Sequence, residues 1–293
     1  MKKITFDFYH RKSFADLDEA KKLLEWLLKH PVFRPDRWAP FEPVRKPYDS
    51  VHLPEAIESF ANFEKIQQKK PWESWNGTLL LRRTKSPKCF SYFEWNHYKR
   101  SPFKICFVDL EEKWAKKEEN LKMTVNFCDE IYSMFDGIWF AVLGLDEERE
   151  AKRSFRWFHS KDDHPDGGYY IEEAPGIFLE KGIPGIYWAN YFGPFYVNWF
   201  GREKFDHLPC VHKKYMADGG CFFTTAPSPW EWNTQEALKI QNEIREFLGA
   251  DAFFDMECLR RTVAEKIAEG GGITDDLPSR LIPPCRTPSF PFA

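Results

Sequence analysis

The segment CFSYFEW at residues 89–95 alternates apolar and polar side chains, and it lies between two other apolar runs, TLLLR at 78–82 and FKICFV at 103–108. Alternation over a short run is typical of a strand with one buried face. Turn signals that contain Pro87 and Pro102 separate the three runs. We therefore predict a meander of antiparallel strands.

The sequence before and after this meander predicts a further strand and two helices. The opening run ITFDFY at 4–9 alternates as a strand does, and Ser13 then heads a helix that Pro31 stops. Residues 121–135 carry apolar side chains at helical spacing, and Gly137 is the expected stop.

A third helix is predicted near the C-terminal end. Thr234 is a suitable N-cap and Gly249 a suitable end. Its expected inward stripe consists of Ala237, Ile240, Ile244 and Phe247. Because strands and helices come in blocks rather than in strict alternation, the predicted class is α+β: a mostly antiparallel sheet with helices packed on one face.

Length favours one domain over residues 1–293, with sub-domains 1–136 and 137–293 sharing a core as the alternative. The stretch 31–54 is rich in proline and predicts an irregular connection. The tail 277–293 is also rich in proline, and we expect it to be extended.

Composition excludes several classes of protein. The chain has 42 Lys and Arg against 45 Asp and Glu, a formal net charge of −3, whereas a generic nucleic-acid coat needs a large basic excess. No stretch approaches the roughly 20 consecutive apolar residues of a membrane span. The seven scattered cysteines form no C-x-x-C pair, which predicts reduced thiols. We therefore expect a globular cytoplasmic protein with no cofactor.

Charge is distributed unevenly along the chain. Residues 1–125 hold 25 basic and 18 acidic side chains, whereas residues 126–293 hold 17 and 27. The candidate acidic residues are Asp146, Glu147, Glu148, Glu150, Asp162, Asp163 and Asp166. Two interpretations are open: a solvated face, or an acidic surface that steers a basic partner.

Catalytic and metal-binding motifs are weak. The sequence contains no G-x-x-x-x-G-K-[ST], G-x-S-x-G or H-E-x-x-H motif. The best zinc candidates are His207, Cys210 and His212, but structural zinc sites normally have tighter paired spacings, so we expect no metal. The distance between the two catalytic carboxylates of a hydrolase depends on the fold and cannot be read from their spacing in the sequence. A metal- or carboxylate-dependent hydrolase therefore stays an alternative.

Trp230 and Trp232 follow Pro227 and Pro229 and are expected on a turn. Exposed tryptophans at such a position are typical anchors of a protein interface. Burial in the core is the competing interpretation.

The segment IPGIYWANYFGPFYV at 183–197, completed by Gly201, resembles a pattern found in bacterial immunity proteins of polymorphic-toxin and type VI secretion systems, specifically the immunity protein 52 family. The residues that carry the resemblance are Gly185, Trp188, Asn190, Gly193, Pro194 and Gly201. Independently of the family, Gly185 and Gly193 would allow unusual backbone angles at the two ends of a strand, and Pro194 would start a helix. We interpret the segment as a structural signature rather than a contact site.

The resemblance implies a cytoplasmic, non-enzymatic protein that binds a toxin and blocks it. The toxin would be a protein, with a basic nuclease as one candidate, and neither direct nucleic-acid binding nor membrane binding is implied. The acidic residues, with Trp230 and Trp232, are the hypothetical contact residues. Alternatives are another accessory binding protein of a phage-defence or toxin–antitoxin system, a hydrolase, and a structural subunit.

Overall fold

The computed structural model describes residues 2–61, 76–96, 104–157, 169–172, 179, 182–254, 261, 265 and 285–288. The chain divides into two compact units. Unit 1 comprises residues 1–145, 190–198 and 214–222, and unit 2 comprises residues 146–189, 199–213 and 223–293. No helix in the described ranges is long and apolar enough to cross a membrane.

The strands and helices follow one another in this order: β1 (Lys3–His10), α1 (Leu17–Lys29), β2 (Arg37–Ala39), β3 (Lys46–Pro47), α2 (Leu53–Ala61), β4 (Asn76–Arg83), β5 (Cys89–Asn96), β6 (Lys104–Glu111), α4 (Glu112–Ala115), α5 (Glu118–Met134), β7 (Phe140–Leu145), α6 (Asp146–Arg153), β8 (Ser154–Trp157), β9 (Tyr169–Glu172), β10 (Ala189–Phe192), α7 (Pro194–Phe200), α8 (Arg202–Asp206), β11 (His212–Tyr215), β12 (Cys221–Thr224), η2 (Pro229–Glu231), α9 (Gln235–Leu248) and η3 (Ala250–Ala252). The predicted α+β class is confirmed.

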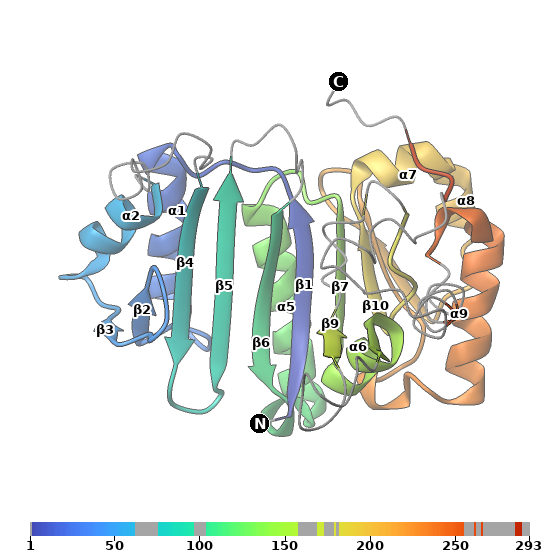
Figure 1. The fold of residues 1–293 in the computed structure, drawn as a ribbon, viewed down its shortest axis with the longest axis horizontal. Helices are drawn as coiled ribbons and strands as arrows, with labels where there is room; N and C mark the ends of the chain where they lie inside the picture. Colours follow the sequence, from blue (N-terminus) through green and yellow to red (C-terminus); the bar gives the residue numbers. More distant parts are fainter. Residues whose placement is uncertain are drawn as a thin grey trace. The chain divides into compact units, whose positions relative to one another are not determined.

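A large sheet has the strand order β11-β12-β10-β7-β1-β6-β5-β4-β2-β3, and β8 and β9 form a separate pair (Figure 1). The predicted meander is confirmed as β4, β5 and β6, each antiparallel to the next. The predicted opening strand is β1, and it lies between β6 and β7 with both pairings antiparallel.

Helix α5 runs along one face of the sheet in unit 1, behind β6 and β1 in the view of Figure 1. Phe135, at the end of this predicted helix, packs on Phe8 of β1 and Phe93 of β5, with ring centroids 4.7 and 5.4 Å apart. Edge-to-face contacts between buried rings stabilise a core beyond the burial of their area. The aromatic residues of this face therefore hold helix and sheet together.

The first helix begins later than the sequence predicts. Ser13 Oγ accepts a hydrogen bond from Ala15 N in a local turn, whereas Asp16 caps α1 by accepting from Asp18 N at 2.7 Å. The prediction of Ser13 as the start was therefore wrong by one turn, because either residue type can cap.

The proline-rich stretch 31–54 differs from the predicted irregular connection, whereas the predicted extended tail lies mostly outside the described residues. The proline-rich stretch 31–54 contains β2, β3 and the start of α2, and β2 pairs with β4. Of the tail 277–293, only residues 285–288 lie within the described ranges, and they have no regular structure.

Helix α9 in unit 2 begins and ends where predicted, with Thr234 Oγ1 accepting from Ala237 N at 3.2 Å and Gly249 after its last residue. Its inward stripe differs from the prediction. The buried side chains are Ala237, Gln241, Ile244 and Leu248, whereas Phe247 is 40% exposed. The buried stripe thus contains the polar Gln241, whereas the apolar pattern predicted its neighbour Ile240.

Candidate functional site

Helix α6 has the sequence DEEREAKR, which is typical of a solvated helix, yet two of its side chains turn inward in unit 2. Glu148 and Lys152 are one turn apart and form an ion pair of 2.6 Å. The Glu148 side chain is 0% exposed and that of Lys152 is 18% exposed. Buried charges of this kind are retained only where further hydrogen bonds replace water.

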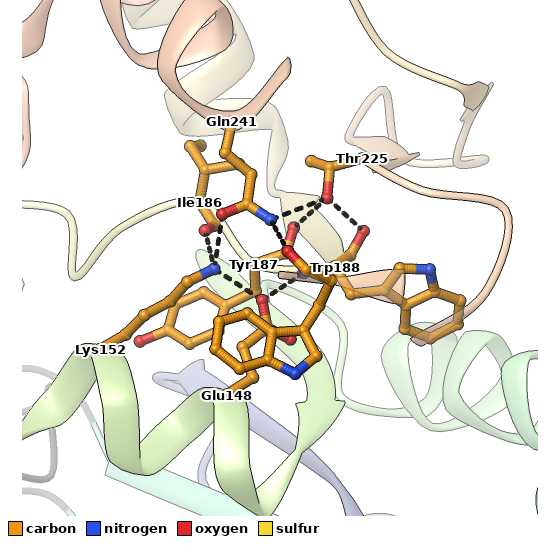
Figure 2. Close-up of polar contacts among 8 residues, drawn as sticks. Glu148, Lys152, Ile186, Tyr187, Trp188, Thr225 and Gln241 are labelled. Atoms are coloured by element: carbon orange, nitrogen blue, oxygen red, sulfur yellow. Dashed lines mark hydrogen bonds and ion pairs between the residues drawn. The ribbon is translucent and has the colours of Figure 1, made fainter. Parts of the chain in front are cut away.

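Those hydrogen bonds come from a chain segment far away in the sequence (Figure 2). Glu148 Oε1 accepts from the backbone N–H of Trp188 at 2.8 Å. Lys152 Nζ donates to Ile186 O at 2.6 Å and to Gln241 Oε1 at 2.9 Å. With the ion pair, these bonds use all three N–H donors of the lysine.

Gln241 of α9 extends the network. Its Nε2 donates to Trp232 O at 3.0 Å and to Thr225 Oγ1 at 3.3 Å. Thr225 Oγ1 in turn donates to Tyr187 O at 3.2 Å. We call Glu148, Lys152, Gln241 and Thr225 the Glu148 network.

Two aromatic rings face the ammonium group of Lys152. Its Nζ lies 4.7 Å from the ring centroid of Tyr187 and 5.5 Å from that of Trp232. Cation–π attraction at such distances adds roughly 0.5–2 kcal/mol when the cation is partly desolvated. The lysine therefore also fixes the position of Trp232 beside α6.

A cavity of about 430 Å³ adjoins the network. Lys152, Gln241 and Arg245 line its polar side, and Phe253 and Phe254 line an apolar side. Arg245 Nε is buried and has no hydrogen-bond partner within the described residues. The cavity can therefore accept a polar or anionic group.

The acidic residues that were predicted to form a partner surface differ in their exposure to solvent. Glu147 and Glu150 are exposed on α6, and Asp146 is partly exposed with its carboxylate 3.6 Å from Arg149. Glu148 is buried in the network, so the structure removes it from the accessible surface. Asp162, Asp163 and Asp166 lie outside the described residues.

Trp230 and Trp232 are half-buried at the short helix η2. Ser228 Oγ accepts from Trp230 N at 3.3 Å and thereby caps that helix. Through the contact with Lys152, Trp232 lies next to the helix that carries Glu147 and Glu150. Glu147 and Glu150 are exposed while Glu148 and Lys152 of the same helix turn inward, so the two carboxylates lie on other faces of α6 than the one that contacts Trp232.

The part of the signature segment that lies in unit 2 has clear structural roles. Gly185 and Gly201 have positive φ angles of +140° and +95°, which favour glycine. Trp188 Nε1 donates to Ala226 O at 3.0 Å, and its side chain is buried.

The part that lies in unit 1 turns from β10 into α7. Asn190 is fully buried in β10, and Pro194 is the first residue of α7. A Cβ on Gly193 would lie 2.0 Å from Ile138 O, so this glycine is required by close packing. The predicted unusual backbone angle at Gly193 was wrong, since its φ is not among the positive ones. The predicted strand is also shorter than expected, because only 189–192 pair.

The weak zinc candidates are not assembled into a cage. His207 and His212 are exposed and Cys210 is half-buried. Burial raises the pKa of the Cys210 thiol, which opposes formation of the thiolate that zinc requires. Within the described residues, no group of three or more His, Cys, Asp or Glu side chains is placed to hold a metal ion.

Unit 1 contains a second polar cluster, between α5 and the strands β10 to β12. Tyr191 OH donates to Asp129 Oδ1 at 3.0 Å, and Lys214 pairs with the other oxygen of the same carboxylate. Tyr132 OH donates to Asp218 Oδ2 at 2.9 Å. Burial raises the pKa of both phenols well above the ordinary value, so they act as neutral donors. Their role is to attach α5 to the neighbouring strands.

Sequence reasoning missed Lys152, Gln241 and Arg245. The spacing of four between Glu148 and Lys152 was visible, but the same spacing is common in exposed helical ion pairs. Gln241 was visible only as the polar residue within an apolar stripe. Neither signal identifies which carboxylate of the run EE at 147–148 is the buried one.

The sequence matches no protein-family model, and it matches no curated protein. Among solved structures, the chain is similar to the "Pseudomonas aeruginosa T6SS protein PA0821", at 10% sequence identity over 85% of this chain and 72% of that chain, with a TM-score of 0.48. The similarity is distant, and it assigns no activity to this chain.

Proposed function

We propose that this chain is a non-enzymatic immunity protein that binds a cognate bacterial toxin of a polymorphic-toxin or type VI secretion system and neutralises it. One observation carries the proposal: α6 presents Glu147 and Glu150 to solvent, and Lys152 of the same helix holds the half-buried Trp232 beside it. Exposed carboxylates steer a basic protein to a surface, and a tryptophan within an interface is a typical anchor.

The signature segment supports the class of function. Its sequence resembles the immunity protein 52 family, and the Glu148 network contacts the backbone of this segment at Ile186 and Trp188. The network thereby attaches α6 to the backbone of this segment and to α9, which restricts the movement of the helix. A rigid surface loses less conformational entropy on binding, which favours tight association.

The functional test is co-expression with the product of the adjacent open reading frame. We expect that product to arrest growth when expressed alone and to be harmless when this chain is present. Growth arrest that this chain does not relieve, or a neighbour that is not toxic, would contradict the proposal.

The surface is tested by charge reversal. The double variant Glu147→Lys/Glu150→Lys should slow association with the purified toxin about tenfold at low salt, because like charges replace steering ones. Raising the ionic strength should reduce the difference, since surface charges are screened. Trp232→Ala should mainly speed dissociation.

The matched control is Glu119→Lys/Asp136→Lys, which changes the net charge equally at exposed positions of unit 1. Equal loss of association in both double variants would show that net charge alone matters and would remove α6 from the proposed interface. Turnover of a substrate by the purified chain would favour the hydrolase alternative instead.

A further inference from the structure

A second cavity, of about 550 Å³, opens in unit 1 and includes Phe90 and Phe107. Cys89, Ser91 and Phe93 of β5 are buried, and Phe93 packs on Phe135, the residue that follows α5. Because successive side chains of a strand point to opposite faces, Phe90 lies on the face away from α5. None of the residues of the proposed toxin surface belongs to the described lining of this cavity.

The strand register gathers cations around this cavity. Arg82 of β4 is paired with Phe90 of β5, and Phe90 is paired with Asp109 of β6. Lys3 of β1 is paired with Glu111, whose N–H donates to Lys88 O. Residues distant in sequence thus converge on one cavity.

Cations outnumber carboxylates in this cavity. The lining contains four cationic side chains and two carboxylates, namely Lys3, Arg82, Arg83, Lys88, Glu42 and Asp109.

The Asp109 carboxylate is already satisfied. It accepts from Lys3 Nζ at 2.6 Å and from Thr5 Oγ1 at 2.8 Å, and its side chain is 5% exposed. Glu42 is 3.7 Å from Arg82 and 58% exposed, a surface pair that contributes at most about 1 kcal/mol. Neither carboxylate therefore prevents Arg82 from binding another anion.

The side chains of the two other cations form no ion pair in the described part of the chain, although the Glu111 carboxylate lies beside Lys88 and accepts from its backbone N–H at 3.0 Å. Arg83 donates to Arg34 O and Ser86 O at 3.1 and 3.4 Å, so neutral carbonyls hold it in place. Lys88 is exposed, and only its backbone is engaged. An excess of positive charge held on strand ends is suited to a phosphate group.

The aromatic rings of Phe90 and Phe107 line the cavity beside these cations. Phe107 and Tyr92 are stacked with centroids 5.4 Å apart and an interplanar angle of 14°. Phe90 lies 5.9 Å from Phe107, and Arg82 Cζ lies 5.7 Å from the Phe90 ring. Phe90 and Tyr92 pack on the buried cluster Ala39, Val44 and Leu80 and remain half-buried. Half-buried rings of this kind provide a surface on which a planar base can stack.

We propose that this cavity binds a nucleotide, with its phosphates between Arg82 and Lys88 and its base against Phe90 and Phe107. The volume lies in the range of about 300–1,000 Å³ that is usual for small-molecule sites. The near-neutral net charge of the chain does not oppose nucleotide binding, because a single nucleotide needs only a local excess of positive charge. The site goes beyond the proposed toxin binding and does not depend on it.

Calorimetric titration of the full chain with ADP, pyrophosphate, adenosine and a hexaglutamate peptide tests the proposal. ADP should bind most tightly, pyrophosphate more weakly and adenosine least. Arg82→Gln and Lys88→Gln should each weaken ADP binding about tenfold, which corresponds to about 1.4 kcal/mol. The matched control is Lys21→Gln, an equal charge change at a side chain 57% exposed on α1.

A separate variant tests the proposed stacking of the base on Phe90. Phe90→Leu should weaken ADP about fivefold and leave pyrophosphate unchanged. Lys88 is exposed, so its variant keeps the test valid if the Arg82 variant unfolds. No heat with ADP, an equal effect of Lys21→Gln, or preference for hexaglutamate would each overturn the nucleotide assignment, while toxin binding would be unaffected.

Discussion

The Glu148–Lys152 pair stabilises unit 2 mainly through the backbone groups of residues 186–188 that it binds, and less through the attraction between the two charges. Taking both charges out of water costs several kcal/mol for each ion. The backbone N–H of Trp188 and the carbonyl of Ile186 replace part of that water at 2.8 and 2.6 Å. The same bonds fix residues 186–188 against α6. Removing either charge leaves the other one buried without its partner.

We therefore expect Glu148→Gln and Lys152→Met each to lower the free energy of unfolding by about 3 kcal/mol. Glu147→Gln, at the exposed neighbouring position, should change it by less than about 0.5 kcal/mol. Urea denaturation followed by tryptophan fluorescence measures the differences. The double variant should lose less than the sum of the single ones; strict additivity would contradict a direct coupling of the two charges.

Sequence could locate this acidic run but could not sort its members. Helical periodicity with apolar residues identifies a buried face, whereas DEEREAKR offers only charged side chains and one alanine. What buries Glu148 is the polar backbone of 186–188, which approaches from a distant part of the chain. Such an approach is a tertiary contact and leaves no local signal.

At the scale of elements, the junction of β10 and α7 shows why a segment can be recognised before its structure is understood. Pro194 predicted the helix start, and this prediction is confirmed. The reason for Gly193 was not predictable, because Ile138 is remote in sequence. The helices α5 and α9 were predictable because their apolar spacing is regular, and the inward stripe of α9 was misplaced where Gln241 interrupts it.

Gly193→Ala tests the close approach at this junction. The added Cβ would overlap Ile138 O, a backbone atom that cannot rotate away, so we expect a loss of about 3 kcal/mol of stability. Gly219→Ala is the control, because its Cβ would meet nothing within 4 Å and only its φ of +93° opposes alanine, at a cost of about 1 kcal/mol. Thermal unfolding should rank the variants in this order. Equal losses would mean that the junction relaxes around the added Cβ and that close packing does not require glycine at position 193.

At the scale of the molecule, the chain does not divide at a single point. The sequence suggested sub-domains meeting after residue 136, before the strand β7. In the structure, unit 1 includes β7 and also takes residues 190–198 and 214–222 from the second half. Composition and turns indicate where a chain bends, but they do not indicate which distant strand completes a sheet.

This interleaving predicts that residues 1–145 do not fold alone, although they contain most of unit 1. All six residues of β7 are buried, and β10 is its neighbour on the side away from β1. Without 190–192, the fragment would expose an apolar strand edge, which is a typical aggregation site. We expect the 1–145 fragment to be insoluble or aggregated on size-exclusion chromatography. Co-expression with 146–293 should recover soluble, associated protein. A monomeric 1–145 fragment with strand circular dichroism and cooperative unfolding would show that β10 to β12 are dispensable for the sheet.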